Sequence, residues 1–332
     1  MKIRDTDYLY ATARLRALEK NMLTARDFEK MVDASSFEES FRVANETSLH
    51  SRCSAKDYET AIAGMLEGTY SLIAELTDSS PIFDIFRFKY DGHNLKVIIK
   101  AQAIGRDPLG SMSPLGVIEP RSLIAMFQDK KIEGLPERMA EAAYAASESL
   151  AKSNDPQIVD LMLDTAVMRS MLERAEETKF PFLIDVVRRM IDVENLRTAV
   201  RIKRMGKEET LLRRVLTPGG YLEIDRLCEA FRAQGFEAMR DMLFVTDYSA
   251  HFAPLLDDVG ENRPLTAFER GADNYLMLRL RSTRLVAFGL EPVISYLLAK
   301  EAEAKQVRII LASRLAGVPK EKISERMRET YA

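Results

Sequence analysis

The chain is poor in residues that bind metals or form disulfides. Its 332 residues include two cysteines, Cys53 and Cys228, and three histidines, His50, His93 and His251. None of them has a second cysteine or histidine at the spacing of a metal site. We therefore expect no metal site and no disulfide framework, and we interpret the cysteines as small buried hydrophobic residues in a reducing compartment.

The chain also lacks an excess of charge and a long apolar run. Its net charge is −3, so no basic field indicates nucleic acid or an anionic membrane surface as a partner. No stretch approaches the ~18 uninterrupted apolar residues of a membrane span. Charges throughout the first twenty residues leave no apolar core for a signal peptide. We expect a cytoplasmic protein that does not insert into a membrane by itself.

Motifs of catalysis are missing as well, because HExxH, GxxxxGK[ST] and GxSxG do not occur. The acidic segment 257–261 is similar to the aspartate-rich magnesium motif of helical isoprenoid synthases. The prolines around it, such as Pro254, predict a solvated loop, and no second acidic motif completes a metal cluster. A helical lyase or prenyl synthase that uses Asp257, Asp258 and Glu261 is one alternative. We predict instead that the chain has no catalytic, cofactor-binding or metal-binding residues.

Glycine and proline are sparse, with 15 and 12 residues, and they cluster at a few places. The two main clusters, 106–116 and 217–220, predict breaks between long helices. No stretch alternates with a period of two, so the predicted fold class is all-α. Helical spacing of apolar residues predicts long helices over 8–22, 57–76, 156–177 and 265–288.

A charged block occurs three times, as DGHNLKVIIKAQAIG, DVENLRTAVRIKRMG and EAEAKQVRIILASRLAG. The copies align on Gly105, Gly206 and Gly317, about a hundred residues apart, which indicates a triplicated unit. We predict three similar helical-bundle domains, 1–113, 114–217 and 218–332, arranged with pseudo-threefold symmetry. In each, a last long helix begins near a proline and stops at the glycine. The alignment also places together the acids Asp91, Asp192 and Glu303.

The cations of the recurrent block are open to two interpretations of their role. They form a solvated stripe that complements the helix dipole, or they form a ring that faces an acidic partner or an axial cavity. Asn94 and Asn195 also recur, with Gln306 in the third copy, and we expect them to satisfy buried polar contacts between helices. The candidate partner-facing residues are Lys96, Lys100, Arg197, Arg201 and Arg308.

Several segments resemble the C subunit of prokaryotic V/A-type ATPases, which is the relative of the eukaryotic d subunit. They include the opening YLYATARLRALEKNML, the segment FDIFRFKYDGHNLKVIIKAQ and the stretch from Gly289 to Tyr331. The resemblance covers essentially the whole chain. Its most specific element near the C-terminus comprises Phe288, Gly289, Glu291, Pro292, Tyr296, Lys300, Glu301 and Glu303.

The resemblance implies a funnel of three helical domains without a catalytic site or cofactor. In that family the protein lies between the central shaft, made by the D and F subunits, and the membrane rotor ring of proteolipids, and it links them mechanically. We therefore expect a monomer within a hetero-complex, peripheral on the cytoplasmic face of the membrane. A helical-repeat adaptor unrelated to a rotary motor is the alternative, and the choice between H⁺ and Na⁺ stays open.

Overall fold

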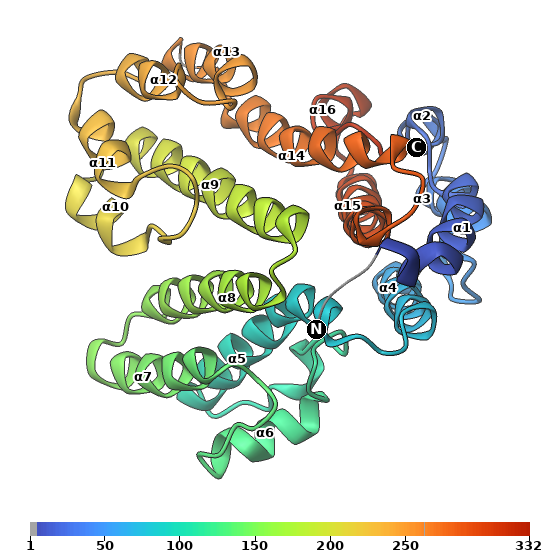
Figure 1. Cartoon of the computed structure of the whole chain (residues 1–332), viewed down its shortest axis with the longest axis horizontal. Helices are drawn as coiled ribbons and strands as arrows, with labels where there is room; N and C mark the ends of the chain where they lie inside the picture. The colour runs from blue at the N-terminus through green and yellow to red at the C-terminus, as the bar shows by residue number, and fades with distance from the viewer. Residues whose placement is uncertain (1–4, 262) are drawn as a thin grey trace. The chain divides into compact units, whose positions relative to one another are not determined.

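The computed structural model describes residues 5–261 and 263–332, and these residues contain helices and loops but no β-strand. The predicted all-α class is confirmed. Contacts group the chain into two compact units, which we call unit 1 (1–80 with 229–332) and unit 2 (81–228). Figure 1 shows their helices. The division into three domains, 1–113, 114–217 and 218–332, stays a prediction.

Unit 2 is built around three long consecutive helices, α7, α8 and α9, which pack through buried aliphatic residues. α8 packs against α5, α7 and α9, and α7 and α8 run side by side in Figure 1. Leu95 of α5 and Leu163 of α8 are fully buried. The elements of unit 2 are η5 (Pro81–Phe86), α5 (Phe88–Ala103), η6 (Leu109–Ser111), α6 (Pro120–Gln128), α7 (Glu137–Ser153), α8 (Gln157–Thr178), α9 (Pro181–Arg204), α10 (Glu209–Val215) and α11 (Ile224–Arg232), which runs past residue 228.

Unit 1 brings the two ends of the chain together around its longest helix, α15. Helices α1 to α4 from the N-terminal part all pack on α15, which buries apolar residues such as Val293, Leu297 and Val307. The elements of unit 1 are η1 (Asp5–Tyr8), α1 (Leu9–Leu18), η2 (Glu19–Asn21), α2 (Ala25–Asp33), α3 (Phe37–Ala44), η3 (Asn45–Leu49), η4 (Ala55–Asp57), α4 (Tyr58–Leu76), α12 (Glu237–Leu243), α13 (Ser249–Gly260), α14 (Leu265–Arg281), η7 (Ser282–Leu285), α15 (Leu290–Leu315) and α16 (Lys320–Ser324).

Most helix boundaries follow the local signals in the sequence. α4 and α8 lie within one residue of the predicted ranges, whereas α14 ends at Arg281 and a 3-10 turn replaces its predicted last turns. Pro181 is the first residue of α9, where a missing N–H has no consequence. Pro81 instead opens the 3-10 helix η5 before α5, and Pro292 is the third residue of α15. The predicted proline at the helix start is thus confirmed for α9 and α15, whereas Pro81 lies seven residues before α5 begins.

The acidic segment 257–261 is not a loop, which corrects the prediction. It is helical to Gly260 as the end of α13, with Pro254 inside the helix. A proline removes one backbone hydrogen bond, and the buried side chains of Phe252, Leu256 and Val259 hold this helix against its neighbours. The acids bind arginines: Asp257 pairs with Arg240 at 3.0 Å and Asp258 with Arg263 at 2.6 Å.

Candidate functional site

The three copies of the charged block are α5, α9 and α15, which we call the recurrent helices, and all three end in the same backbone motif. Gly105, Gly206 and Gly317 have φ of +64°, +64° and +67°. Each glycine N–H donates to the carbonyl three residues earlier, and the next N–H donates to the carbonyl five residues before it. This is the Schellman ending. A Cβ at these glycines would touch nothing within 4 Å, so the left-handed backbone, not crowding, requires glycine.

One amide side chain on each recurrent helix binds a single loop residue through both of its backbone groups. The Nδ2 of Asn94 donates to the carbonyl of Ser113 at 2.9 Å, and its Oδ1 accepts from the Ser113 N–H at 2.7 Å. The predicted contact between helices is therefore a contact between helix and loop, and it satisfies the backbone groups of a residue outside regular secondary structure. The equivalent pairs are Asn195 with Thr217, at 2.8 and 2.9 Å, and Gln306 with Arg328, at 3.3 and 3.0 Å.

Three residues earlier on the same helix face, an acid binds the loop that leads into a short helix. Asp91 accepts from the N–H groups of Val117 at 2.7 Å and Ile118 at 3.2 Å. A Cβ on Gly116 would lie 2.4 Å from Asp91 Oδ1, so glycine permits this close approach. Asp192 repeats the arrangement with Tyr221 at 2.7 Å and Leu222 at 3.0 Å, beside Gly220.

In the third copy, the acid reaches a loop from the other end of the chain. Glu303 accepts from the Leu23 N–H at 2.6 Å, and Leu23 lies two residues before α2 begins. Ile118 and Leu222 lie two residues before α6 and α11 in the same way. In all three copies the acid therefore binds a backbone N–H two residues before a short helix begins. In the third copy this helix, α2, comes before α15 in the chain instead of following it. We call the three sets Asp91/Asn94, Asp192/Asn195 and Glu303/Gln306 the acid–amide pairs.

Glu303 also belongs to a buried polar network with Lys300 and Ser48. Lys300 and Glu303 are each 5% exposed. Their side chains bind one another, and Ser48 Oγ lies 2.5 Å from Glu303 and 2.7 Å from Lys300. Because a buried charge without a partner is strongly unfavourable, this network makes the packing of α15 on the N-terminal part depend on Glu303.

The electrostatic environment of Asp91 differs from that of a surface carboxylate. Burial raises the pKa of Asp91 from 3.8 to about 6, while its two backbone hydrogen bonds and Arg87 act in the opposite direction. Removal from water thus outweighs the hydrogen bonds to the charged form. The carboxyl is expected to titrate in mildly acidic solution.

The predicted partner-facing cations mostly bind carboxylates of their own chain. Lys96 and Lys100 of α5 bind Asp164 and Asp160 of α8 at 2.5 and 2.6 Å. The side chains of Lys96 and Lys100 are 19% and 35% exposed, so Lys100 keeps more surface for a partner than Lys96 does. Whether they meet a partner stays a prediction. Of the others, Arg308 binds Glu59 of α4 at 2.8 Å, Arg197 lies 3.4 Å from Glu194, and Arg201 is exposed.

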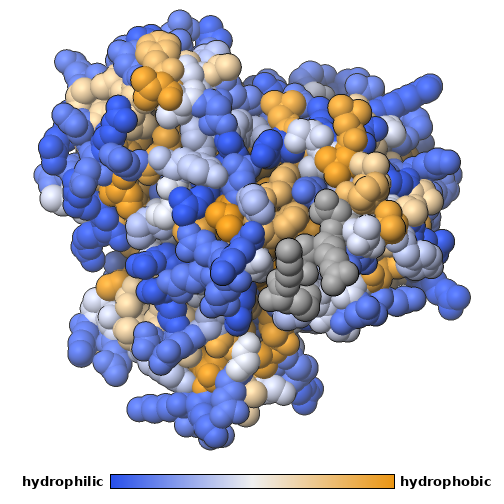
Figure 2. Space-filling view, viewed as in Figure 1, coloured by the Kyte–Doolittle hydropathy of each residue, from blue (hydrophilic) through white to orange (hydrophobic). Residues whose placement is uncertain are grey.

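An exposed apolar side chain lies within two residues of each terminal glycine. Ile104, Met205 and Leu315 are 65%, 66% and 64% exposed. Single exposed apolar side chains are common on protein surfaces, and Figure 2 shows such orange side chains interspersed among blue ones. Ile104 and Met205 directly precede their glycines, whereas Leu315 lies two residues before Gly317. What distinguishes these three is that an exposed apolar side chain lies close to the glycine in each copy.

Other kinds of site have little support in the part of the chain that is described. No group of three or more metal-ligating residues occurs within 5–261 and 263–332. No described helix is both long enough and apolar enough to cross a membrane. The features that recur are therefore structural contacts and surfaces.

Sequence reasoning aligned the acids but missed what they bind. The available signal was a glycine 25 or 28 residues after each aspartate: Gly116 and Gly220, in the two turn-forming clusters. The loop bound by Glu303 had no such signal, because it lies about 280 residues away in the chain.

The described part of the chain is helical and carries the same helix three times, each with the same glycine ending and the same amide contact to a loop. A family model described as ATP synthase (C/AC39) subunit matches residues 11–326. The chain therefore belongs to this family.

Curated relatives agree with that assignment over nearly their whole length. The C subunit of the V-type sodium ATPase of Enterococcus hirae is 22% identical, and the match spans 96% of this chain and 97% of the relative. The C subunit of the A-type ATP synthase of Methanocaldococcus jannaschii is 25% identical over 95% and 85% of the two chains. The C subunit of the V-type ATP synthase of Thermus thermophilus is 22% identical over 96% and 98%. The resemblance identified from the residues is thus confirmed.

Proposed function

We propose that this chain is the non-catalytic subunit of a V/A-type rotary ATPase that connects the central shaft, made by the D and F subunits, to the membrane rotor ring of proteolipids. The observation that carries the proposal is the family match over residues 11–326. In this role the chain transmits torque between ion movement at the ring and ATP chemistry in the head. It works at the cytoplasmic face of the membrane without entering the bilayer.

Torque transmission requires a part that deforms little under load. An ion that crosses the membrane releases ~2.3 kcal/mol per charge per 100 mV, and a compliant connector would dissipate part of that energy. Close-packed helices resist deformation. The acid–amide pairs add directional hydrogen bonds that tie each recurrent helix to a loop. These contacts support a stiff connector.

Pseudo-threefold symmetry is part of the proposal. The three Schellman endings and three acid–amide pairs give each copy the same local geometry, as expected of three similar domains around one axis. The exposed Ile104, Met205 and Leu315 then offer each domain an apolar contact for a neighbouring protein of the complex.

The first experiment removes the chain from the complex and measures coupling. Complexes from membranes of a deletion strain are compared with those from a strain that carries the tagged chain. We expect the tagged chain to co-purify with D, F and a proteolipid, and its deletion to abolish ATP-driven ion transport while the detached head still hydrolyses ATP. Ion transport that persists without the chain would refute the proposed function.

The second experiment tests whether Lys96 faces a partner. Lys96→Gln and Asp164→Asn both break the same internal ion pair, but only the first removes a cation that a partner could bind. If Lys96 contacts an acidic partner, Lys96→Gln weakens binding to the isolated D–F shaft, whereas Asp164→Asn leaves it unchanged. Equal effects of the two variants would assign Lys96 to internal packing alone.

A further inference from the structure

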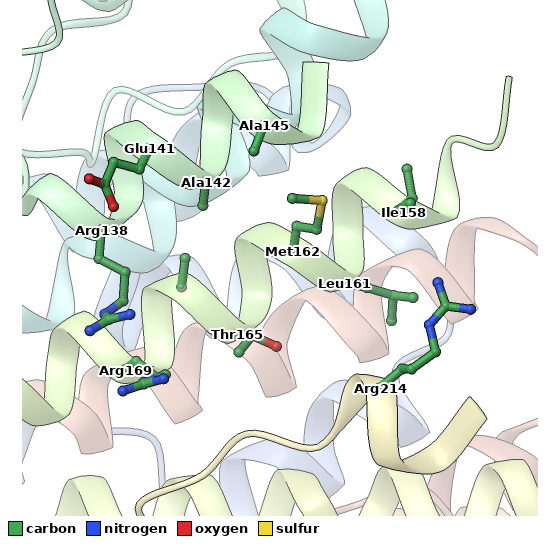
Figure 3. Close-up of a pocket in the computed structure, with 11 residues that line it drawn as sticks. Arg138, Glu141, Ala142, Ala145, Ile158, Leu161, Met162, Thr165, Arg169 and Arg214 are labelled. Carbon is green, nitrogen blue, oxygen red and sulfur yellow. The ribbon is translucent and has the colours of Figure 1, made fainter. Parts of the chain in front are cut away.

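Unit 2 contains an open groove whose lining combines small apolar residues with arginines. It has a volume of about 540 Å³ and lies over α7 and α8, with Arg214 of α10 at one end. Figure 3 shows its lining side chains. None of the recurrent acids or amides lines it, so the groove is separate from the acid–amide pairs.

Both walls of the groove repeat with the period of a helix. On α7, Arg138, Glu141, Ala142 and Ala145 follow steps of three and four. On α8, the groove is lined by Ile158, Leu161, Met162, Thr165 and Arg169, again at helical steps. This second stripe spans about three turns, or ~16 Å at 1.5 Å per residue.

The shape of the groove matches a third helix laid along the first two. Ala142 and Ala145 have short side chains, which leave depth for the ridge of an incoming helix. Met162 extends toward α7 in Figure 3, and methionine adapts to the shape of a docked side chain. A compact small molecule would not use a stripe three turns long.

The two ends of the groove differ in charge, because Glu141 and Glu173 accompany the arginines at one end only. Arg138 and Arg169 lie at one end and share a single carboxylate, that of Glu173, at 2.5 and 3.9 Å. Arg214 lies at the opposite end, near Leu161, and has no ion-pair partner among the described residues. The groove therefore favours an occupant with an acidic group near Arg214.

We propose that this groove binds an amphipathic α-helix of another chain of the complex. The bound helix presents apolar residues at i, i+3, i+4 and i+7 to Leu161, Met162 and Thr165. It also carries an acidic residue at the end of that stripe that meets Arg214. The inference depends on membership in a multisubunit complex and not on torque transmission.

The test places a photo-cross-linking amino acid at Thr165 in the intact complex. Ala151 on α7 is the control position, because it is exposed and does not line the groove. We expect the yield at 165 to exceed that at 151 about tenfold and the cross-linked residues of one partner chain to be spaced by three or four. Lipid, a second copy of this chain, a partner segment without acidic residues, or equal yields at both positions would overturn the proposal.

Two matched pairs of variants test the shape and the charge of the groove separately. Ala145→Trp fills the groove, and Ala151→Trp adds the same bulk elsewhere on α7. Arg214→Glu reverses one end of the groove, and Arg226→Glu makes the same change on the exposed surface of α11. Each groove variant is expected to reduce the cross-link at 165 about tenfold, while each control retains it. A groove variant that behaves like its control would contradict the proposed occupant.

Discussion

Asn94, Asn195 and Gln306 satisfy a loop backbone with one side chain, at a place where the chain has no regular structure. A carboxamide carries a donor and an acceptor side by side, and it therefore matches the N–H and carbonyl of one loop residue. Asn94 and Asn195 are nearly fully buried, so water cannot replace these bonds. The recurrence of an amide at this position reflects that geometry.

We expect Asn195→Ala to destabilise the protein by about 1–3 kcal/mol, because it leaves the buried N–H and carbonyl of Thr217 without partners. Urea unfolding followed by circular dichroism measures the change. Gln102→Ala, at an exposed position of α5, serves as a control with little expected effect. A loss at Asn195 no larger than that of the control would show that the loop rearranges to satisfy its own backbone.

The titration of Asp91 makes the free energy of unfolding depend on pH, and the sign of this dependence follows from its pKa. Its pKa in the folded protein, about 6, lies above the ordinary value of 3.8. Between these values the folded state binds more protons than the unfolded state, so this contribution is fully present below pH 3.8 and is lost as pH rises through 6. Because one pH unit between the two pKa values corresponds to about 1.4 kcal/mol, the contribution is on the order of 1–3 kcal/mol.

The measurement compares the free energy of unfolding at pH 4 to 7 in the wild-type chain and in Asp91→Asn, which cannot titrate. We expect the variant to be less stable overall but to lack the part of the slope between pH 4 and 6 that Asp91 contributes. Identical slopes in the two proteins would mean that Asp91 stays ionised throughout this range.

At the scale of the element, the recurrent helices show how a single glycine determines where a long helix ends. α5, α9 and α15 all stop within two residues of a glycine with positive φ. Other residues tolerate that conformation poorly, at ~1–2 kcal/mol. The helix end in turn sets where the following loop begins and hence which residue meets the amide.

We expect Gly105→Ala to destabilise the protein by about 1–2 kcal/mol. Gly64→Ala is the matched control, because Gly64 lies inside α4 and its added Cβ also meets nothing within 4 Å. Alanine in a helix interior is favoured over glycine by about 0.5–1 kcal/mol, so the two variants should shift the melting temperature in opposite directions. Shifts of the same sign would contradict the assignment of strain to the left-handed backbone.

At the scale of the whole molecule, unit 1 depends on both ends of the chain. The N-terminal helices α1 to α4 cover α15, and the buried Glu303–Lys300 pair binds Ser48 and Leu23 from the N-terminal part. Without residues 1–80, the apolar surface of α15 and this ion pair would face water.

We therefore expect a fragment of residues 81–332 to bind a hydrophobic dye and to aggregate, and residues 1–80 supplied in trans to restore a compact complex. Glu303→Ala should prevent that recovery, because it leaves Lys300 buried without its carboxylate, at a cost of roughly 3–5 kcal/mol. Size-exclusion chromatography of the mixed fragments measures the outcome. A fragment 81–332 that is monomeric and as stable as the intact chain would refute this dependence.

Local chemistry in the sequence determined the all-α class, most helix ranges, the triplicated block and the family, because helical periodicity and glycine endings depend only on neighbouring residues. Two local predictions were wrong: Pro81 opens a separate 3-10 helix instead of α5, and the segment predicted as a loop at 257–261 is helical to Gly260, where Phe252, Leu256 and Val259 are buried. Only the tertiary structure decided what Asp91, Asp192 and Glu303 bind, that α15 packs on the N-terminal helices, and that α7 and α8 form a groove. Most of those contacts join residues that are far apart in the chain. A local sequence pattern does not say which distant segments pack against one another.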